Sequence, residues 1–295
     1  MASAAQIRKK HPGSTCIRAV KIRHSRRRGL EDQLASLKRD NDELNRAMYE
    51  AAQVQRRLCG PRYFRTDSYE FASEIFPVRH LSGDFISVMQ LAGDLVFVIG
   101  DIAGKGLLAG MWFTHMVGMI RREVAEHGDP AAALTSVDRN LLLTGVEFPL
   151  TTLFLARLSP ETGQVIFCNA GHPPALLIRE QGQVEELNEG GPILGVISGA
   201  QFVNGITKLN HHDTLLAYSD GIAECRNELG IEFGTEQLLT FAQTLSSLDP
   251  NAMLFSLLAA AQNFIGSRDR EDDIALLVLR RLGSREIERS ETNCA

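Results

Sequence analysis

Apolar residues change their spacing along the chain, and this change divides it into two parts. Over residues 30–58 they recur in alternating steps of four and three, with charged residues filling the gaps. If Leu34 occupies heptad position a, Asn41 occupies the next a position, and leucines fill most d positions. This pattern predicts a coiled-coil helix. A single amphipathic helix packed on its own domain is the alternative, because Ala51 and Gln55 would make weak coiled-coil contacts.

Gly60 and Pro61 end the helical pattern, so we expect a domain boundary there. The linker helix is assigned to 29–60, a globular domain to 62–282 and a polar tail to 283–295. In the domain, apolar and β-branched runs bounded by turn residues predict strands at 95–100, 151–158, 164–171, 174–180, 214–220 and 273–282. Helical periodicity predicts helices at 107–127, 130–143, 235–245 and 250–265.

The order of these elements indicates the fold class. A short polar turn, "SPETG", joins the strands at 151–158 and 164–171, which predicts a hairpin and therefore antiparallel pairing. Adjacent antiparallel strands interrupted by helix pairs indicate an α+β fold rather than a doubly wound parallel sheet.

The composition is typical of a soluble globular protein. The 295 residues are 44% hydrophobic and 23% charged, and no apolar run approaches the roughly 18 to 20 residues that a membrane-spanning helix requires. The five cysteines are scattered without metal-ligand spacing, and their odd number argues against a disulfide framework. A reducing cytoplasm is therefore the expected compartment.

The net charge of −5 conceals a strongly basic N-terminus. Residues 1–28 contain nine Lys or Arg residues and no acidic residue. We interpret this segment as a disordered, solvated tail, since no aromatic residues are interleaved for stacking on bases. Contact with nucleic acid or an anionic surface, and a targeting presequence, are the alternatives.

A glycine-rich loop, "GDIAGKG" at 100–106, lies between a predicted strand and a predicted helix. A Walker-type phosphate loop would need four residues between its first glycine and the Gly-Lys pair, and then a hydroxyl residue. Only three residues separate Gly100 from Gly104, and Gly106 stands at the hydroxyl position. The loop instead places Asp101 at the end of an apolar strand, where a carboxylate is costly unless a cation meets it.

Further acids lie at the ends of predicted strands. Asp84 precedes an apolar run, Asp220 ends another, and Asp272 and Asp273 precede a third. Taken singly, each is explained as a turn residue or a helix cap. Four such places in one domain point to divalent cations, because converging carboxylates repel one another unless they are neutralised. All-oxygen ligation favours Mg²⁺ or Mn²⁺ over Zn²⁺.

Five motifs also resemble a known family in sequence and in order: "SGDF", "GDIAGKG", "NAGHPPALL", "SDGIAE" and "EDDIALLVL". They are similar to the metal-dependent PPM serine/threonine phosphatases, in particular the bacterial SpoIIE/RsbU-like subgroup, over roughly residues 62–282. The resemblance implies an αββα sandwich of two antiparallel sheets flanked by helix pairs, here preceded by the coiled-coil helix. It also implies hydrolysis of a phosphoprotein by water that two Mn²⁺ or Mg²⁺ ions activate.

This resemblance assigns catalytic, metal-binding roles to particular positions. Asp101 would bridge both ions, while Asp84 and the carbonyl of Ile102 would support one of them. Asp220 and Asp272 would hold the other ion.

Several neighbouring positions leave alternatives open. Asp273 replaces Asp272 as a ligand if the alignment of "DDIA" is shifted by one residue. Lys105 stands where the family often has His, and Ala275 where it often has Thr; neither is an expected ligand, so activity should survive. Arg79 is a candidate phosphate clamp, because a guanidinium can meet two phosphate oxygens at once, and a solvated surface arginine is the alternative.

His172, in "NAGHPP", could donate a proton, but a structural role at the hairpin end is favoured. Two other function classes are a nucleotide-binding regulatory module that uses the loop at 100–106 and a catalytically inactive phosphatase-like binding module. Every expected acid is present, which favours an active enzyme.

The expected partners follow from the resemblance and from the heptads. By resemblance, the substrate would be a phosphorylated anti-sigma-factor antagonist in a partner-switching pathway. The Asn at an a position favours a parallel two-stranded coil, so we predict a homodimer joined along 30–58. We expect no sensor domain before the catalytic region, so an upstream activator would act through residues 1–60. Nucleic-acid binding is not expected.

Overall fold

The computed structural model describes residues 12–143 and 148–283. They begin with a long helix, α1 (Pro12–Leu58), and divide into two compact units. One unit ends at Glu50, and the other begins at Ala51 and contains all the remaining elements. None of the helices in the described ranges is long and apolar enough to span a membrane.

The start of α1 differs from the expected tail. The helix begins at Pro12, so part of the segment 1–28 is helical. Proline is compatible with the first helical position, and Lys and Arg are good helix formers, so a basic composition does not oppose a helix. The boundaries at 29 and 61 remain predictions, and residues 1–11 and 284–295 lie outside the described residues.

The strands form two sheets. The first has the order β1 (Tyr63–Arg65), β2 (Tyr69–Phe76), β12 (Ile274–Arg281), β11 (Thr214–Tyr218), β7 (Ala175–Ile178) and β8 (Val184–Leu187). The second has the order β10 (Gly205–Lys208), β6 (Gln164–Ala170), β5 (Thr151–Leu158), β4 (Asp94–Ile102) and β3 (Phe85–Leu91). Neighbouring strands in these two paths are antiparallel, and the short β9 (Gly190–Gly191) pairs in parallel with β6.

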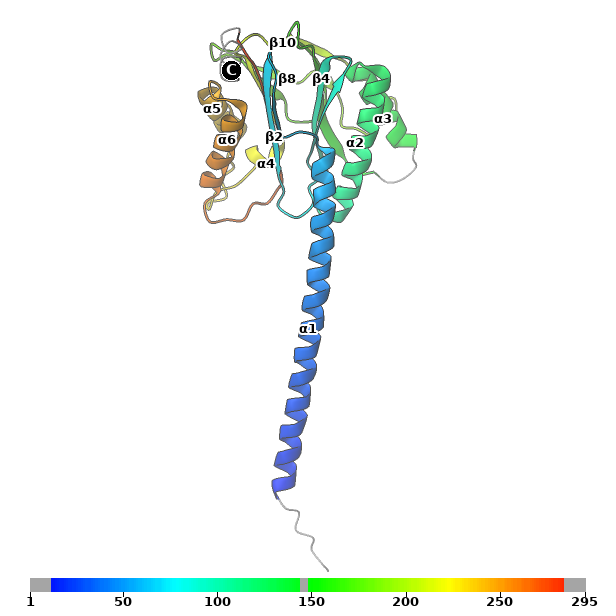
Figure 1. Cartoon of the computed structure of the whole chain (residues 1–295), viewed down its shortest axis with the longest axis vertical. Helices are drawn as coiled ribbons and strands as arrows, with labels where there is room; N and C mark the ends of the chain where they lie inside the picture. Colours follow the sequence, from blue (N-terminus) through cyan, green and yellow to red (C-terminus); the bar gives the residue numbers. More distant parts are fainter. Residues whose placement is uncertain (1–11, 144–147, 284–295) are drawn as a thin grey trace, which may run out of the picture. The chain divides into compact units, whose positions relative to one another are not determined.

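Helix pairs cover the outer faces of the sheets (Figure 1). On the second sheet lie α2 (Leu107–His127) and α3 (Pro130–Leu143), and on the first lie α5 (Thr235–Leu245) and α6 (Pro250–Ile265). A one-turn helix, α4 (Asp220–Ala223), follows β11. This is the expected αββα sandwich, and the expected hairpin is confirmed by the antiparallel pairing of β5 with β6.

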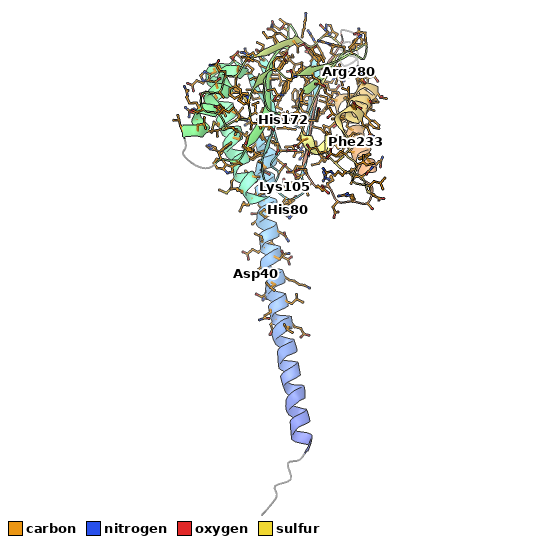
Figure 2. The ribbon with its side chains drawn as sticks, turned by 180° about the vertical axis from the view of Figure 1, so that it is seen from behind. Asp40, His80, Lys105, His172, Phe233 and Arg280 are labelled. Carbon is orange, nitrogen blue, oxygen red and sulfur yellow. The ribbon has the colours of Figure 1, made fainter. Side chains whose placement is uncertain are left out.

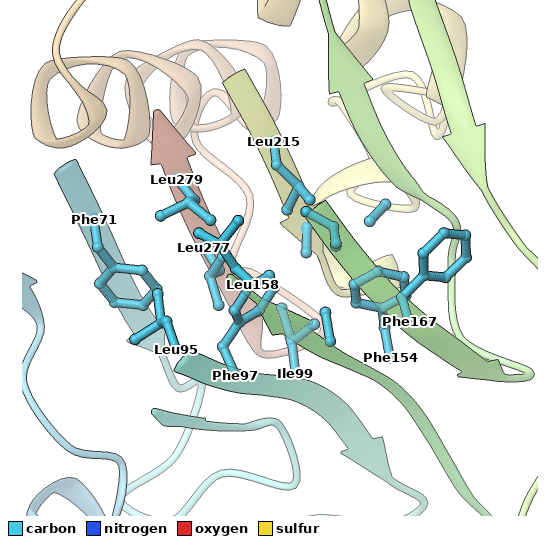
Figure 3. Close-up of a cluster of buried hydrophobic side chains, with 14 of the residues drawn as sticks. Phe71, Leu95, Phe97, Ile99, Phe154, Leu158, Phe167, Leu215, Leu277 and Leu279 are labelled. Carbon is cyan, nitrogen blue, oxygen red and sulfur yellow. The ribbon is translucent and has the colours of Figure 1, made fainter. Parts of the chain in front are cut away.

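The inner faces of the two sheets form a continuous apolar core (Figure 3). Phe71, Leu277 and Leu279 come from the first sheet, and Phe97 and Phe154 come from the second. All five side chains are fully buried. This core holds the sheets together, so loops at the strand ends are mounted on a rigid base.

The last turns of α1 pack on the sandwich. Gln55, at a predicted a position, is buried; its side-chain amide donates to the Ser82 carbonyl (3.1 Å) and its oxygen accepts from the Ser82 amide (3.3 Å). The Leu58 carbonyl accepts a 2.7 Å hydrogen bond from Arg121. At this end of the helix the alternative of packing on the chain's own domain is correct, because the buried Gln55 amide finds its hydrogen-bond partners in Ser82 of that domain.

Candidate metal centre and active site

Two antiparallel strand pairs bring the candidate acids to one end of the sandwich. In the second sheet Asp84 directly precedes β3, and Asp101 lies near the end of its neighbour β4. In the first sheet Asp220 follows β11, and Asp272 lies just before its neighbour β12. Antiparallel pairing places the end of one strand beside the start of the next, so each sheet presents two carboxylates.

These carboxylates interact across the gap between the sheets. Burial and then the charges of Asp220 and Asp272 raise the pKa of Asp101 to about 6. Burial, followed by the charge of Asp101, raises the pKa of Asp84 well above its ordinary value, and a hydrogen bond from Ser219 opposes this rise. Burial and the charge of Asp272 also raise the pKa of Asp220. Divalent cations would relieve this repulsion, so the oxygen donors fit Mg²⁺ or Mn²⁺.

Within the described ranges, no group of three or more His, Cys, Asp or Glu side chains is arranged so that it could hold a metal ion.

The backbone at Gly83, next to Asp84, lies very close to the backbone of the loop that follows Asp101. A Cβ atom on Gly83 would lie 2.6 Å from the Ile102 carbonyl oxygen, 3.0 Å from the Gly104 carbonyl oxygen and 3.2 Å from Asp101 Oδ1. The Ile102 amide also donates to the Gly83 carbonyl at 3.3 Å. Glycine is therefore required here, because a side chain would push apart the segments that carry the expected ligands.

Ser219 is a site residue that the sequence reasoning missed. Its hydroxyl donates to Asp84 Oδ2 at 2.6 Å and accepts from the Ala275 amide at 2.9 Å. The side chain is fully buried and so links the first sheet to an acid of the second. Its position immediately before Asp220, in "SDG", was the available signal.

The two adjacent acids Asp272 and Asp273 have different surroundings. Asp273 is buried and accepts from the Val78 amide (2.7 Å), the Ser82 hydroxyl (2.8 Å) and the Gly83 amide (3.0 Å). The side chain of Asp272 is 55% exposed at the site. Both oxygens of Asp273 are thus occupied by donors, so Asp272 is the better candidate for a ligand.

Two cationic residues of interest differ in their contacts: Lys105 meets an acid, and Arg79 lies near Gly106. Lys105 Nζ lies 3.0 Å from Asp272 Oδ1 and donates to the Glu271 carbonyl (Figure 2). Arg79 is exposed, and its guanidinium lies 3.9 Å from where a Cβ atom on Gly106 would be. In a Walker-type loop the lysine would reach bound phosphate, whereas Lys105 here crosses to the acids of the other sheet.

His172 is buried within the sandwich (Figure 2). Its Nδ1 lies 3.0 Å from the Thr152 hydroxyl, and Thr152 pairs with Asp101 on the neighbouring strand. The side chain of Asn169 bonds to both the amide and the carbonyl of His172, at 2.7 and 2.9 Å. Burial lowers the pKa of His172 to about 3, so its neutral ring supports the favoured structural role.

Comparison with known proteins identifies the family. A family described as "Stage II sporulation protein E (SpoIIE)" matches residues 92–282. The chain belongs to the SpoIIE family. It is therefore a PPM-type serine/threonine phosphatase, and the family is metal-dependent, as the resemblance of the five motifs implied.

Individual relatives agree with this assignment. The chain is 24% identical over 235 residues to phosphoserine phosphatase RsbU of Bacillus subtilis, covering 78% of this chain and 69% of RsbU. The SiaA PP2C domain of Pseudomonas aeruginosa has the same fold, with a TM-score of 0.70, 19% identity and coverage of 81% of this chain and 98% of that one. The RsbU and RsbW domains of a Mycobacterium tuberculosis protein match with a TM-score of 0.64 and 25% identity, over 73% of this chain and 60% of that one.

Proposed function

We propose that this phosphatase acts through two Mn²⁺ or Mg²⁺ ions held by Asp84, Asp101, the Ile102 carbonyl, Asp220 and Asp272. The convergence of four strand-end carboxylates, three of them with a raised pKa, is the observation that carries this proposal. When bound, the cations would activate the attacking water and balance the charge on the phosphoryl group.

The protein groups have distinct tasks in this proposal. Ser219 fixes the orientation of Asp84 through their 2.6 Å hydrogen bond. Asp101 lies within electrostatic reach of Asp220 and Asp272, as a ligand shared by two ions must. Arg79 is exposed and lies near Gly106, in the loop that follows Asp101, and its guanidinium would bind the phosphoryl oxygens of the substrate.

The substrate is inferred by analogy with the relatives. RsbU is named a phosphoserine phosphatase, and one structural relative carries RsbU and RsbW domains together. We infer that this chain dephosphorylates Ser or Thr of an anti-sigma-factor antagonist in a partner-switching pathway, in the cytoplasm. Incubation with candidate phosphoproteins, followed by phosphoprotein gels, tests the substrate separately from the chemistry.

The N-terminal helix supports a homodimer. Leu30, Leu34, Leu37 and Leu44 are 55 to 66% exposed along α1, and an apolar stripe of this spacing is covered when a second helix packs on it. Because Gln55 packs on its own domain, the coil would end before that residue. An activator that binds residues 1–60 would then reach the catalytic unit through the last turns of α1.

A metal-dependent phosphatase assay tests the proposed chemistry. The full chain should hydrolyse p-nitrophenyl phosphate with Mn²⁺ and lose activity with a chelator. Asp101→Asn and Asp220→Asn should each lose at least about a hundredfold in rate, because each removes a charge that holds the cations. Asp67→Asn, which changes an exposed acid in the turn before β2, is the matched control and should keep full activity. Full activity in both site variants would refute the assignment.

A further inference from the structure

Lys105 joins the two edges of the candidate site. It lies in the loop between β4 and α2, between Gly104 (φ 112°) and Gly106 (φ 81°), whose backbone conformations favour glycine. Its ammonium lies 3.0 Å from Asp272 Oδ1 and donates to the carbonyl of Glu271. The ammonium of Lys105, from a loop of the second sheet, thus contacts the loop that precedes β12 in the first sheet.

The same ammonium acts on a second acid of the site. The charge of Lys105 lowers the pKa of Asp220, against the effects of burial and of Asp272. Among the residues that the structure describes, one ion pair involves a candidate ligand acid, and it joins Lys105 to Asp272. Lys105 therefore contacts Asp272 and acts through its charge on Asp220, the two carboxylates that are assigned to one metal ion.

We propose that Lys105 is a tethered competitor for the ion held by Asp220 and Asp272, and that it sets the affinity of this metal site. The inference rests on the proposed function. A divalent cation on Asp272 would repel an ammonium in contact with the same carboxylate, so metal binding requires Lys105 to move away. The Lys105 side chain is 36% exposed and long, so it can move into solvent once the ion pair is broken.

A purely structural ion pair predicts the opposite sign. If Lys105 only orients Asp272, removing the ammonium would leave a freer carboxylate and would weaken metal binding or leave it unchanged. If Lys105 competes, removing the ammonium would strengthen binding, because the cation no longer displaces a charge of the same sign. The direction of the change in affinity therefore separates the two roles.

Titration calorimetry of Mn²⁺ into the chelator-stripped full chain tests the proposal. In Lys105→Met, which keeps the length of the side chain without its charge, the weaker binding event should be about tenfold tighter than in the wild type. Lys105→Arg keeps a cation and should stay within about twofold of wild type. Lys208→Met removes one positive charge from the edge strand β10 and controls for the change in net charge.

Each outcome decides a different claim. The wild-type chain must first bind Mn²⁺ and hydrolyse p-nitrophenyl phosphate. If Lys105→Met then binds Mn²⁺ with an affinity equal to or lower than that of the wild type, only the role of Lys105 is overturned. A wild-type chain that binds no Mn²⁺ overturns the proposed metal chemistry and this inference with it. If Lys105→Met lowers the thermal melting temperature, Lys105→Gln is titrated in its place, and the same tightening is required.

Discussion

Replacing Asp273 should damage folding, whereas replacing its neighbour Asp272 should damage only the chemistry. Asp273 is 5% exposed and accepts three hydrogen bonds, from the Val78 amide, the Ser82 hydroxyl and the Gly83 amide. These bonds tie the segment between β2 and β3 to the start of β12. In Asp273→Asn, one acceptor oxygen becomes an NH₂ group that faces donors.

The expected loss follows from the number of bonds. A hydrogen bond to a charged group contributes about 1.5 to 3 kcal/mol, and a buried donor left without a partner costs about 1 to 3 kcal/mol. The asparagine keeps one oxygen, so at least one bond survives. We therefore expect Asp273→Asn to lower the free energy of unfolding by about 2 to 4 kcal/mol.

Urea denaturation of both variants measures this difference. Asp272 is 55% exposed and pairs with Lys105, and an exposed ion pair contributes about 0 to 1 kcal/mol, so Asp272→Asn should unfold close to wild type. Its Mn²⁺-dependent activity should nevertheless fall at least about a hundredfold, because the variant loses a proposed ligand charge. The slope of the free energy against urea should be the same in all three proteins.

The opposite pattern would refute the assignment of roles. If the free energy of unfolding of Asp273→Asn lies within about 0.5 kcal/mol of the wild-type value while activity is lost, the Asp273 carboxylate does not stabilise the segment between β2 and β3 as inferred. If Asp272→Asn keeps wild-type activity, then Asp273 must be reconsidered as the ligand.

Three further predictions concern pH, backbone packing and assembly. In chelator-treated protein, stability should fall as the pH rises from about 4 through about 6, because the raised pKa of Asp101 (about 6) makes the folded chain bind more protons than the unfolded chain over that range. Urea titrations across this range check the trend, and Asp101→Asn should reduce its slope but not abolish it, because Asp84 and Asp220 also have raised pKa values. Gly83→Ala should lower the free energy of unfolding by about 1 to 3 kcal/mol, since its Cβ would lie 2.6 Å from the Ile102 carbonyl oxygen; an unchanged urea midpoint would contradict this. Leu37→Asp should turn the dimer into a monomer in light scattering at tens of micromolar, because this exposed side chain lies on the proposed coiled-coil stripe, and a wild-type monomer would reject the coil.

Local patterns were sufficient for most of the framework. The helices expected at 107–127, 130–143, 235–245 and 250–265 have the observed bounds, because each is bracketed by Gly, Pro or Asp and carries a clear helical period. The strand at 151–158 is also confirmed residue for residue. By contrast, β1, β2, β8, β9 and β10 were missed, and β3 was noted only as an apolar run after Asp84. Strand β8 is four residues long with exposed glutamates, so it forms only because β7 lies beside it.

The sequence by itself determined which acids could form the site, because charged residues at the ends of apolar strands are unfavourable without a partner. That rule made Asp84, Asp101 and Asp220 candidates, and the five motifs led to the correct family. The sequence favoured Asp272 over Asp273 only through the family resemblance, because the two are adjacent in the chain and equal in chemistry. Tertiary structure supports this choice, because only the packing of the β2–β3 segment against β12 supplies the three donors that occupy Asp273.

The same reason explains the other features that only the fold revealed. Gln55 matched a heptad position in sequence, yet it pairs with Ser82, which is distant in the chain. Ser219 and Lys105 each contact an acid carried by the opposite sheet. Periodicity and spacing report the environment of a residue within its own element, whereas these contacts depend on which elements lie together. The tertiary structure alone determines that arrangement.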